Sequence, residues 1–219
     1  LKIKKAVCVY EHKSISFIET LNPSLYKINS SDLSNPLVLN EVAITNRDIN
    51  LSVGASSLKE IEYAINCFVK KSKGKLTLMY GFQSFPTNNF FLNLNKIKTL
   101  SNLFNLDIGF QDHSDGNSFY PFIINSFVMG MGVRVFEQHL RSTLKMKGVD
   151  QESSMNKKEF LKFSNLMREL NSSLGNFDLN QFNIEEKKYR KFQKKSLVYF
   201  NNFKKNSFIN KKDISILRI

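Results

Sequence analysis

The sequence lacks the features of a membrane protein or a disulfide-stabilised one. No stretch approaches the roughly 18 consecutive apolar residues of a membrane span, and the charged residues 1–5 do not resemble a signal peptide. The only two cysteines, Cys8 and Cys67, match no metal-binding spacing. We therefore expect reduced thiols in a cytoplasmic protein that has no membrane partner.

Tryptophan is absent and acidic residues are in the minority, which leaves a net charge of +13. A basic excess of this kind is also found in nucleic-acid-binding proteins. Here it accompanies abundant Lys, Asn, Ile and Phe, a joint bias typical of AT-rich genomes, and the basic residues crowd residues 157–212 at helical spacing. We expect a solvated basic face, whose field also favours anionic substrates, and no specific nucleic-acid partner.

Short apolar segments alternate with helical ones along the chain, which is typical of a parallel sheet or barrel. The expected strands are residues 6–9, 25–29, 49–53, 76–80, 106–110 and 133–136. The expected helices are residues 14–21, 37–44, 58–71, 92–104, 118–129 and 157–174. A standard βα barrel needs eight such units. The six units therefore form either an open sheet or a barrel with two units before Leu1.

Two of these helices carry start signals. Ser57 and Glu60 have the spacing of a capping box, and Asn156 is expected to cap the last helix. Residues 185–200 predict a further helix or an extended connector, and residues 200–219 a linker. The residues of the third helix expected to face the strands are Leu58, Ile61, Ala64, Ile65 and Phe68.

Two of only three histidines come shortly after expected strands: His113 and His139. Imidazoles at the carboxyl ends of neighbouring parallel strands point into the same space, which in a βα barrel is the active-site face. A single histidine at a strand end is more often a hydrogen-bonded structural residue. The pair together favours a metal site.

Seven segments resemble, in order and at matching spacing, motifs of the sialic acid synthases, bacterial enzymes that condense phosphoenolpyruvate with an N-acetylated hexose. Residues 109–114 read Gly-Phe-Gln-Asp-His-Ser where the family has Gly-Tyr-Ser-Asp-His-Thr, and residues 137–139 read Glu-Gln-His where it has Glu-Lys-His. The other five segments are residues 26–32, 52–55, 84–87, 148–150 and 195–198. Each is weak alone, but the ordered set spans nearly the whole chain.

The resemblance implies an α/β fold, a (β/α)8 TIM barrel followed by a small antifreeze-like (SAF) domain. In this register the chain is a partial TIM barrel containing strands three to eight, with a C-terminal linker. Residues 1–175 would be the partial synthase barrel, and residues 176–219 the connector and the start of the antifreeze-like domain. The resemblance also implies a homodimer for the full-length protein.

The implied reaction joins phosphoenolpyruvate to an N-acetylated sugar such as N-acetylmannosamine, forms a nonulosonic acid and releases phosphate. His113 and His139 would bind a divalent metal, Mn²⁺ or Mg²⁺, with Asp112 orienting His113 or a water. Glu137 and Asp150 are assigned as catalytic, and Glu137 would reach the sugar hydroxyls. The structural alternative for Glu137 is an ion pair with Arg134 or Arg141.

The phosphate end of the substrate would lie against Lys27, Ser30 and Ser52. The other residues assigned to substrate binding are Gln83, Phe85, Gln111 and Asp112. Several of these positions depart from the family, and Cys8 stands where the family has a phosphate-binding threonine. The alternative is therefore a catalytically inactive or regulatory relative of the family that binds a sugar phosphate.

Overall fold

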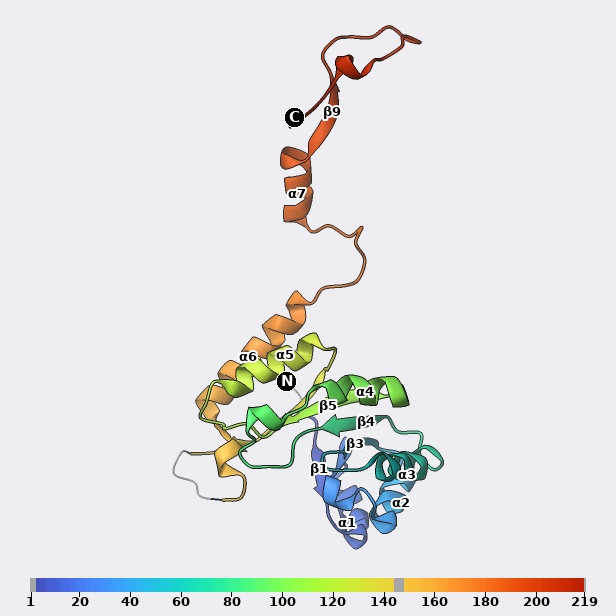
Figure 1. Ribbon diagram of the computed structural model, residues 1–219. Coiled ribbons are helices and arrows are strands. Elements are labelled where there is room, and N and C mark those ends of the chain that lie inside the picture. The colour runs from blue at the N-terminus through green and yellow to red at the C-terminus, as the bar shows by residue number, and fades with distance from the viewer. Residues whose placement is uncertain (1–2, 144–147, 219) are drawn as a thin grey trace. The chain divides into compact units, whose positions relative to one another are not determined.

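The computed structural model describes residues 3–143 and 148–218, and the chain divides into two compact units, Leu1–Ser173 and Leu174–Ile219 (Figure 1). The expected boundary lay at residues 175 and 176. Within the described residues, no helix combines the length and the apolarity needed to cross a membrane.

The first unit is built on a six-stranded parallel sheet whose strands follow one another in chain order. The strands are β1 (Ala6–Val9), β2 (Leu25–Ile28), β3 (Asp48–Ser52), β4 (Leu76–Tyr80), β5 (Asp107–Asp112) and β6 (Val135–Gln138). After each strand a helix returns the chain to the same edge of the sheet, where the next parallel strand begins. This topology confirms the predicted partial barrel.

Helices connect successive strands and cover one face of the sheet, and one more helix follows the last strand of the sheet (Figure 1). They are α1 (Ile15–Thr20), α2 (Pro36–Ile44), α3 (Leu58–Val69), α4 (Asn95–Phe104), α5 (Tyr120–Gly130) and α6 (Lys157–Ser173). Short 3-10 turns occupy His12–Ser14, Ser30–Asp32, Asn89–Phe91 and Gln151–Ser153.

Local sequence signals explain where these helices begin and what they bury. The predicted capping box is present, because Ser57 accepts from the backbone of Glu60 and Glu60 from that of Ser57. The predicted cap Asn156 accepts a hydrogen bond from the backbone N–H of Glu159 at 3.1 Å. Ile61, Ala64 and Phe68 of α3 are buried in the same hydrophobic core as Leu76, Leu78 and Tyr80 of β4. Leu58 was expected on this face, but it is 48% exposed because it lies at the first position of the helix.

The sheet curls strongly. Lys27 on β2 forms an ion pair with Glu137 on β6, although three strands lie between them. In a flat sheet, strands four positions apart are about 19 Å from one another, far beyond the reach of such a contact. Among the described residues, β1 and β6 each pair on one side only. The sheet is therefore an open arc of a barrel, and side chains from distant strands meet inside it.

A second, two-stranded parallel pair was not predicted. It joins β7 (Leu140–Arg141) to β8 (Met155–Asn156) just beyond the end of β6. The segments are two residues long, so they carry no periodic pattern that a sequence could reveal. This pair brings residues 150–156 against the carboxyl end of the sheet.

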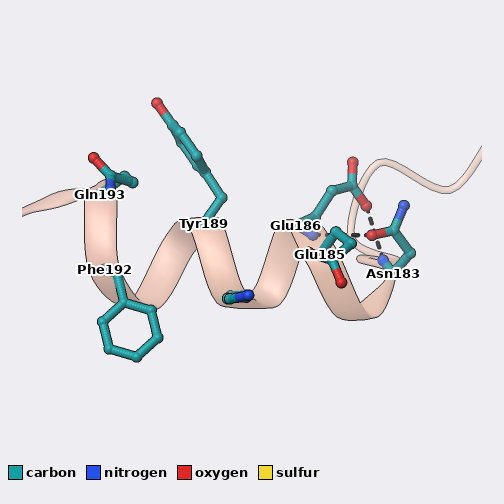
Figure 2. A pocket seen from close by; sticks show the side chains of 7 residues that line it. Asn183, Glu185, Glu186, Tyr189, Phe192 and Gln193 are labelled. Carbon is teal, nitrogen blue, oxygen red and sulfur yellow. Dashed lines mark hydrogen bonds between the residues drawn. The ribbon is translucent and has the colours of Figure 1, made fainter.

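The second unit contains α7 (Ile184–Gln193) and an antiparallel pair, β9 (Lys195–Tyr199) with β10 (Ile214–Arg218). A 3-10 turn, Lys211–Asp213, comes directly before β10. Figure 2 shows the start of α7, where Asn183 and Glu186 form a capping box. The prediction of a linker over residues 200–219 was wrong for residues 214–218. Those five residues form a strand only through pairing with β9, a contact that local pattern does not encode.

Candidate functional site

The predicted site residues gather at the carboxyl ends of the strands. All of them except Asp112 and Glu137 line a cavity of about 230 Å³. The residues that line it are Tyr10, Lys27, Asn29, Ser30, Ser31, Ser52, Gln83, Phe85, Gln111, His113, His139 and Asp150. In a βα barrel this is the face at which active sites are built.

His113 and His139 lie side by side because of strand register. Asp112, the last residue of β5, is paired with Gln138, the last residue of β6, so the next residue of each strand continues the same alignment. The two imidazole centroids are 5.3 Å apart, with their planes inclined by 38°. The structure thus brings the two histidines together as the sequence predicted.

The Nδ1 atom of His113 lies 2.8 Å from the carbonyl oxygen of Phe82. A carbonyl only accepts, so Nδ1 carries the proton and Nε2 has a free lone pair. The ring is also packed by Phe85, with centroids 4.3 Å apart. Burial lowers the pKa of His113, and the neighbouring His139 lowers it further, against the opposing effect of the Phe82 carbonyl. The neutral, metal-binding form of His113 is therefore favoured.

His139 has a buried Nε2 atom with no hydrogen-bond partner in the described part of the chain. A buried polar atom without a partner costs about 1–3 kcal/mol, so it calls for a group from outside the chain. A divalent cation between the two imidazoles would fit this donor set. Residues 3–143 and 148–218 contain no cluster of three or more His, Cys, Asp or Glu side chains suited to a metal. The remaining ligands would have to be waters or substrate oxygens.

Lys27 on β2 lines the cavity and reaches across it to Glu137 on β6. Its ammonium group donates to Glu137, whose Oε1 also accepts from the Gln111 side-chain amide at 3.2 Å. Glu137 was considered as a partner for Arg134 or Arg141, and this alternative is wrong. Arg134 donates to the carbonyls of Met129 and Val133. Glu137 itself does not line the cavity, but it holds two residues that do.

Two further polar atoms near the cavity lack partners among the described residues: Ser52 Oγ and Gln111 Oε1. The Gln111 amide is oriented by Glu137, since a carboxylate accepts and only the NH₂ end can donate to it. Its oxygen is therefore left as an acceptor. A ligand here would find a hydroxyl from Ser52 and an amide oxygen from Gln111 still able to bond.

Glycine is needed where the strand ends crowd together. A Cβ atom on Gly54 would lie 2.2 Å from the carbonyl oxygen of Gly81 and 2.6 Å from the side-chain nitrogen of Gln83. This close approach places Gln83 on the cavity wall. Phe85, two residues later, precedes a cis peptide bond to Pro86 and faces the histidines.

Asp112 does not lie where the sequence suggested. Its side chain is fully buried and outside the cavity. One carboxylate oxygen accepts from the backbone N–H and the hydroxyl of Ser114, at 2.8 and 2.6 Å, and the other accepts from the Asn125 amide at 2.7 Å. Asp112 therefore joins β5 to α5, and its alternation with His113 along the strand turns it away from the ligand side.

Asp150 lines the cavity from a left-handed backbone conformation, with φ of 60°. Sequence analysis missed Tyr10, Asn29 and Ser31 as lining residues. Each lies directly beside a predicted strand end or site residue, and this adjacency is the signal that could have found them. Cys8 does not line the cavity, and burial raises the pKa of its thiol, so the thiol stays protonated at neutral pH.

Comparison with known proteins agrees with this architecture. N,N'-diacetyllegionaminic acid synthase of Campylobacter jejuni is 26% identical over 211 residues, which cover 95% of this chain and 61% of that protein. N-acetylneuraminate-9-phosphate synthase of Drosophila melanogaster is 25% identical over 181 residues, covering 82% and 45%. The solved structure of N-acetylneuraminic acid (sialic acid) synthetase from Leptospira borgpetersenii superposes with a TM-score of 0.73 at 28% identity, covering 84% of this chain and 63% of that one.

The chain spans 61% of the length of the Campylobacter relative and 45% of that of the Drosophila relative. The family model described as the NeuB family matches residues 1–178, which include the whole six-stranded sheet and every residue that lines the cavity. This chain therefore belongs to the NeuB family.

Proposed function

We propose that the protein is a nonulosonic acid synthase that condenses phosphoenolpyruvate with an N-acetylated hexose and releases phosphate. One observation carries the proposal beyond family membership. A single cavity holds a lysine ammonium beside two adjacent imidazoles, of which His113 has a free Nε2 lone pair and His139 has an Nε2 atom without a hydrogen-bond partner in the described residues. Such a cavity offers separate places for an anion and for a cation-bound carbonyl oxygen.

The anion would bind at the end of β2. Lys27 has three N–H donors and Glu137 takes one of them, which leaves donors for a phosphate or carboxylate oxygen. Ser30 and Ser52 line the same cavity, and the unpartnered hydroxyl of Ser52 suits a phosphate oxygen. The net charge of +13 on the chain as a whole adds a field that favours an anionic ligand.

The aldehyde of the open-chain sugar would lie near the imidazole pair. His113 and His139 would hold Mn²⁺ or Mg²⁺, whose role when bound is to polarise that aldehyde as a Lewis acid. Phe85 packs on both rings, with centroids 4.3 and 6.3 Å away, and so restricts their rotation.

Asp150 and Gln111 would bind the polar groups of the sugar. Asp150 is the one carboxylate among the lining residues and accepts hydrogen bonds from hydroxyls. Gln111 presents an amide oxygen, which requires an O–H or N–H donor on the ligand. Glu137 acts on the ligand through Lys27 and Gln111, which it orients. Positioning of the two reactants in this way supplies much of the rate of a bimolecular condensation.

The second candidate is a relative that binds these ligands without turnover. By the resemblance, Gln111 stands where the family has a serine, Phe85 where it has a tyrosine, and Gln83 where it has an asparagine or a serine. Phe85 in particular stands directly on His113 and brings no polar group to the cavity. If those hydroxyls were required for chemistry, binding would persist and catalysis would not.

A phosphate-release assay separates the two candidates. A synthase should release phosphate from phosphoenolpyruvate only when an N-acetylated hexosamine such as N-acetylmannosamine is present. Lys27→Ala should weaken phosphoenolpyruvate binding by about 1.5–3 kcal/mol, the range of a charge-assisted hydrogen bond. The control Lys75→Ala removes an equal charge from an exposed ion pair with Asp107 and should leave binding unchanged. Binding without turnover across several sugars would favour the second candidate, and neither binding nor turnover would reject both.

A further inference from the structure

Residues 150–156 hold the backbone of both histidines, a role separate from the contribution of Asp150 to the cavity. The backbone N–H of Met155 donates to the carbonyl oxygen of His139 at 2.9 Å. The hydroxyl of Ser153 donates to the carbonyl oxygen of His113 at 2.8 Å. One short segment therefore contacts the main chain at both imidazoles.

Ser153 occupies the centre of these contacts. Its side chain is fully buried. While its hydroxyl bonds to His113, its own carbonyl oxygen accepts from the side-chain amide of Gln138 at 3.1 Å, and Gln138 is the residue before His139. The two histidine strands are thus connected through a single serine, independently of their sheet pairing.

The segment is also held in place along its length. The N–H of Gly116 donates to the carbonyl oxygen of Glu152 at 2.8 Å. A Cβ atom on Gly116 would lie 2.3 Å from the carbonyl carbon and oxygen of Ser154, so the loop after His113 packs directly on the segment. A shift of the segment would break these contacts at the same time. The contacts therefore fix the position of the Ser153 backbone.

We infer that Ser153 is a positioning residue that sets the separation of the two imidazoles for a shared divalent cation, an inference that rests on the cation site of the proposed function. With only two protein ligands, affinity depends on both nitrogens being held at the right spacing before the cation arrives. Groups that orient ligands in this way contribute about 10–100-fold to metal affinity. Ser153 does so through the main chain of His113 and, by way of Gln138, through the strand that ends at His139.

The test is a titration of the Ser153→Ala variant with Mn²⁺, monitored by electron paramagnetic resonance. It is carried out well below the unfolding temperature of the variant. We expect the dissociation constant to rise about 10-fold. The matched control is Ser154→Ala, which removes a neighbouring buried hydroxyl whose bond goes to the carbonyl oxygen of Asp150, and it should bind Mn²⁺ like the wild type. A purely structural role would lower the unfolding temperature of the metal-free protein without changing this dissociation constant.

Gln138→Ala provides a second variant, because it removes the other side of the same connection from a half-buried position. It should weaken Mn²⁺ binding in the same direction, and it decides the matter if Ser153→Ala does not fold. Wild-type affinity in the folded variants would overturn the positioning role while leaving the cation site standing. Absence of Mn²⁺ binding by the wild-type chain would overturn the cation site and the positioning role together.

Discussion

The ion pair between Lys27 and Glu137 offers a quantitative test of the curled sheet, because only the curl brings β2 and β6 together. The two side chains are 22% and 25% exposed. An exposed ion pair contributes about 0–1 kcal/mol, whereas loss of one partner of a fully buried pair costs about 3–5 kcal/mol. This pair lies between these limits, and Glu137 keeps its bond from Gln111 when the lysine is lost. We expect Lys27→Met to lower the free energy of unfolding by about 1–3 kcal/mol.

Urea denaturation measures this directly. With a slope near 2 kcal/mol per molar urea, a loss of about 2 kcal/mol moves the midpoint by about 1 M. The double variant Lys27→Met with Glu137→Gln should recover part of the loss, because no unpaired charge remains, so the double-mutant cycle should show a coupling of about 1–2 kcal/mol. The control Lys162→Met breaks an ion pair with Glu159 whose members are 57% and 31% exposed, and it should cost less than about 0.5 kcal/mol. Additive effects of the two single changes would show that these side chains do not interact, and the argument for the curl from this contact would fail.

The remaining predictions concern the metal, the crowded strand ends and the charge. His113→Ala and His139→Ala should each abolish Mn²⁺ binding, since a site with two protein ligands tolerates no loss; unchanged metal content by elemental analysis would reject the assignment. Gly54→Ala should destabilise the protein by about 1–3 kcal/mol in urea denaturation because its Cβ would overlap the Gly81 carbonyl oxygen, whereas Gly130→Ala, with nothing within 4 Å of its Cβ, should not. Affinity for DNA or RNA should be weak, non-specific and steeply dependent on salt, as expected for a general basic surface; a nanomolar, sequence-dependent complex at physiological salt would argue for a nucleic-acid role instead.

Much of the fold could be predicted because its signals are local. Four of the five residues of strand β4 are apolar or aromatic, and α3 has a capping box followed by buried residues at helical spacing. The alternation of such segments determines a parallel sheet, since each helix must return the chain to the same edge. The histidine pair was predictable for the same reason. Each imidazole follows the end of its strand, and register between adjacent parallel strands aligns those ends.

The tertiary structure alone decided the contacts between distant parts of the chain. No local pattern indicates that Glu137 pairs with Lys27 and not with a nearby arginine, because that choice depends on how far the sheet curls. Asp112 follows the strand alternation away from the cavity and into a bond with Asn125, a partner on the next helix. The hydrogen bond from Ser153 to His113 joins residues 40 positions apart in the chain. The pairing of β10 with β9 joins residues that are at least 15 positions apart. Local propensity acts within one or two turns of chain, whereas these contacts exist only once the packed core has fixed where each strand ends.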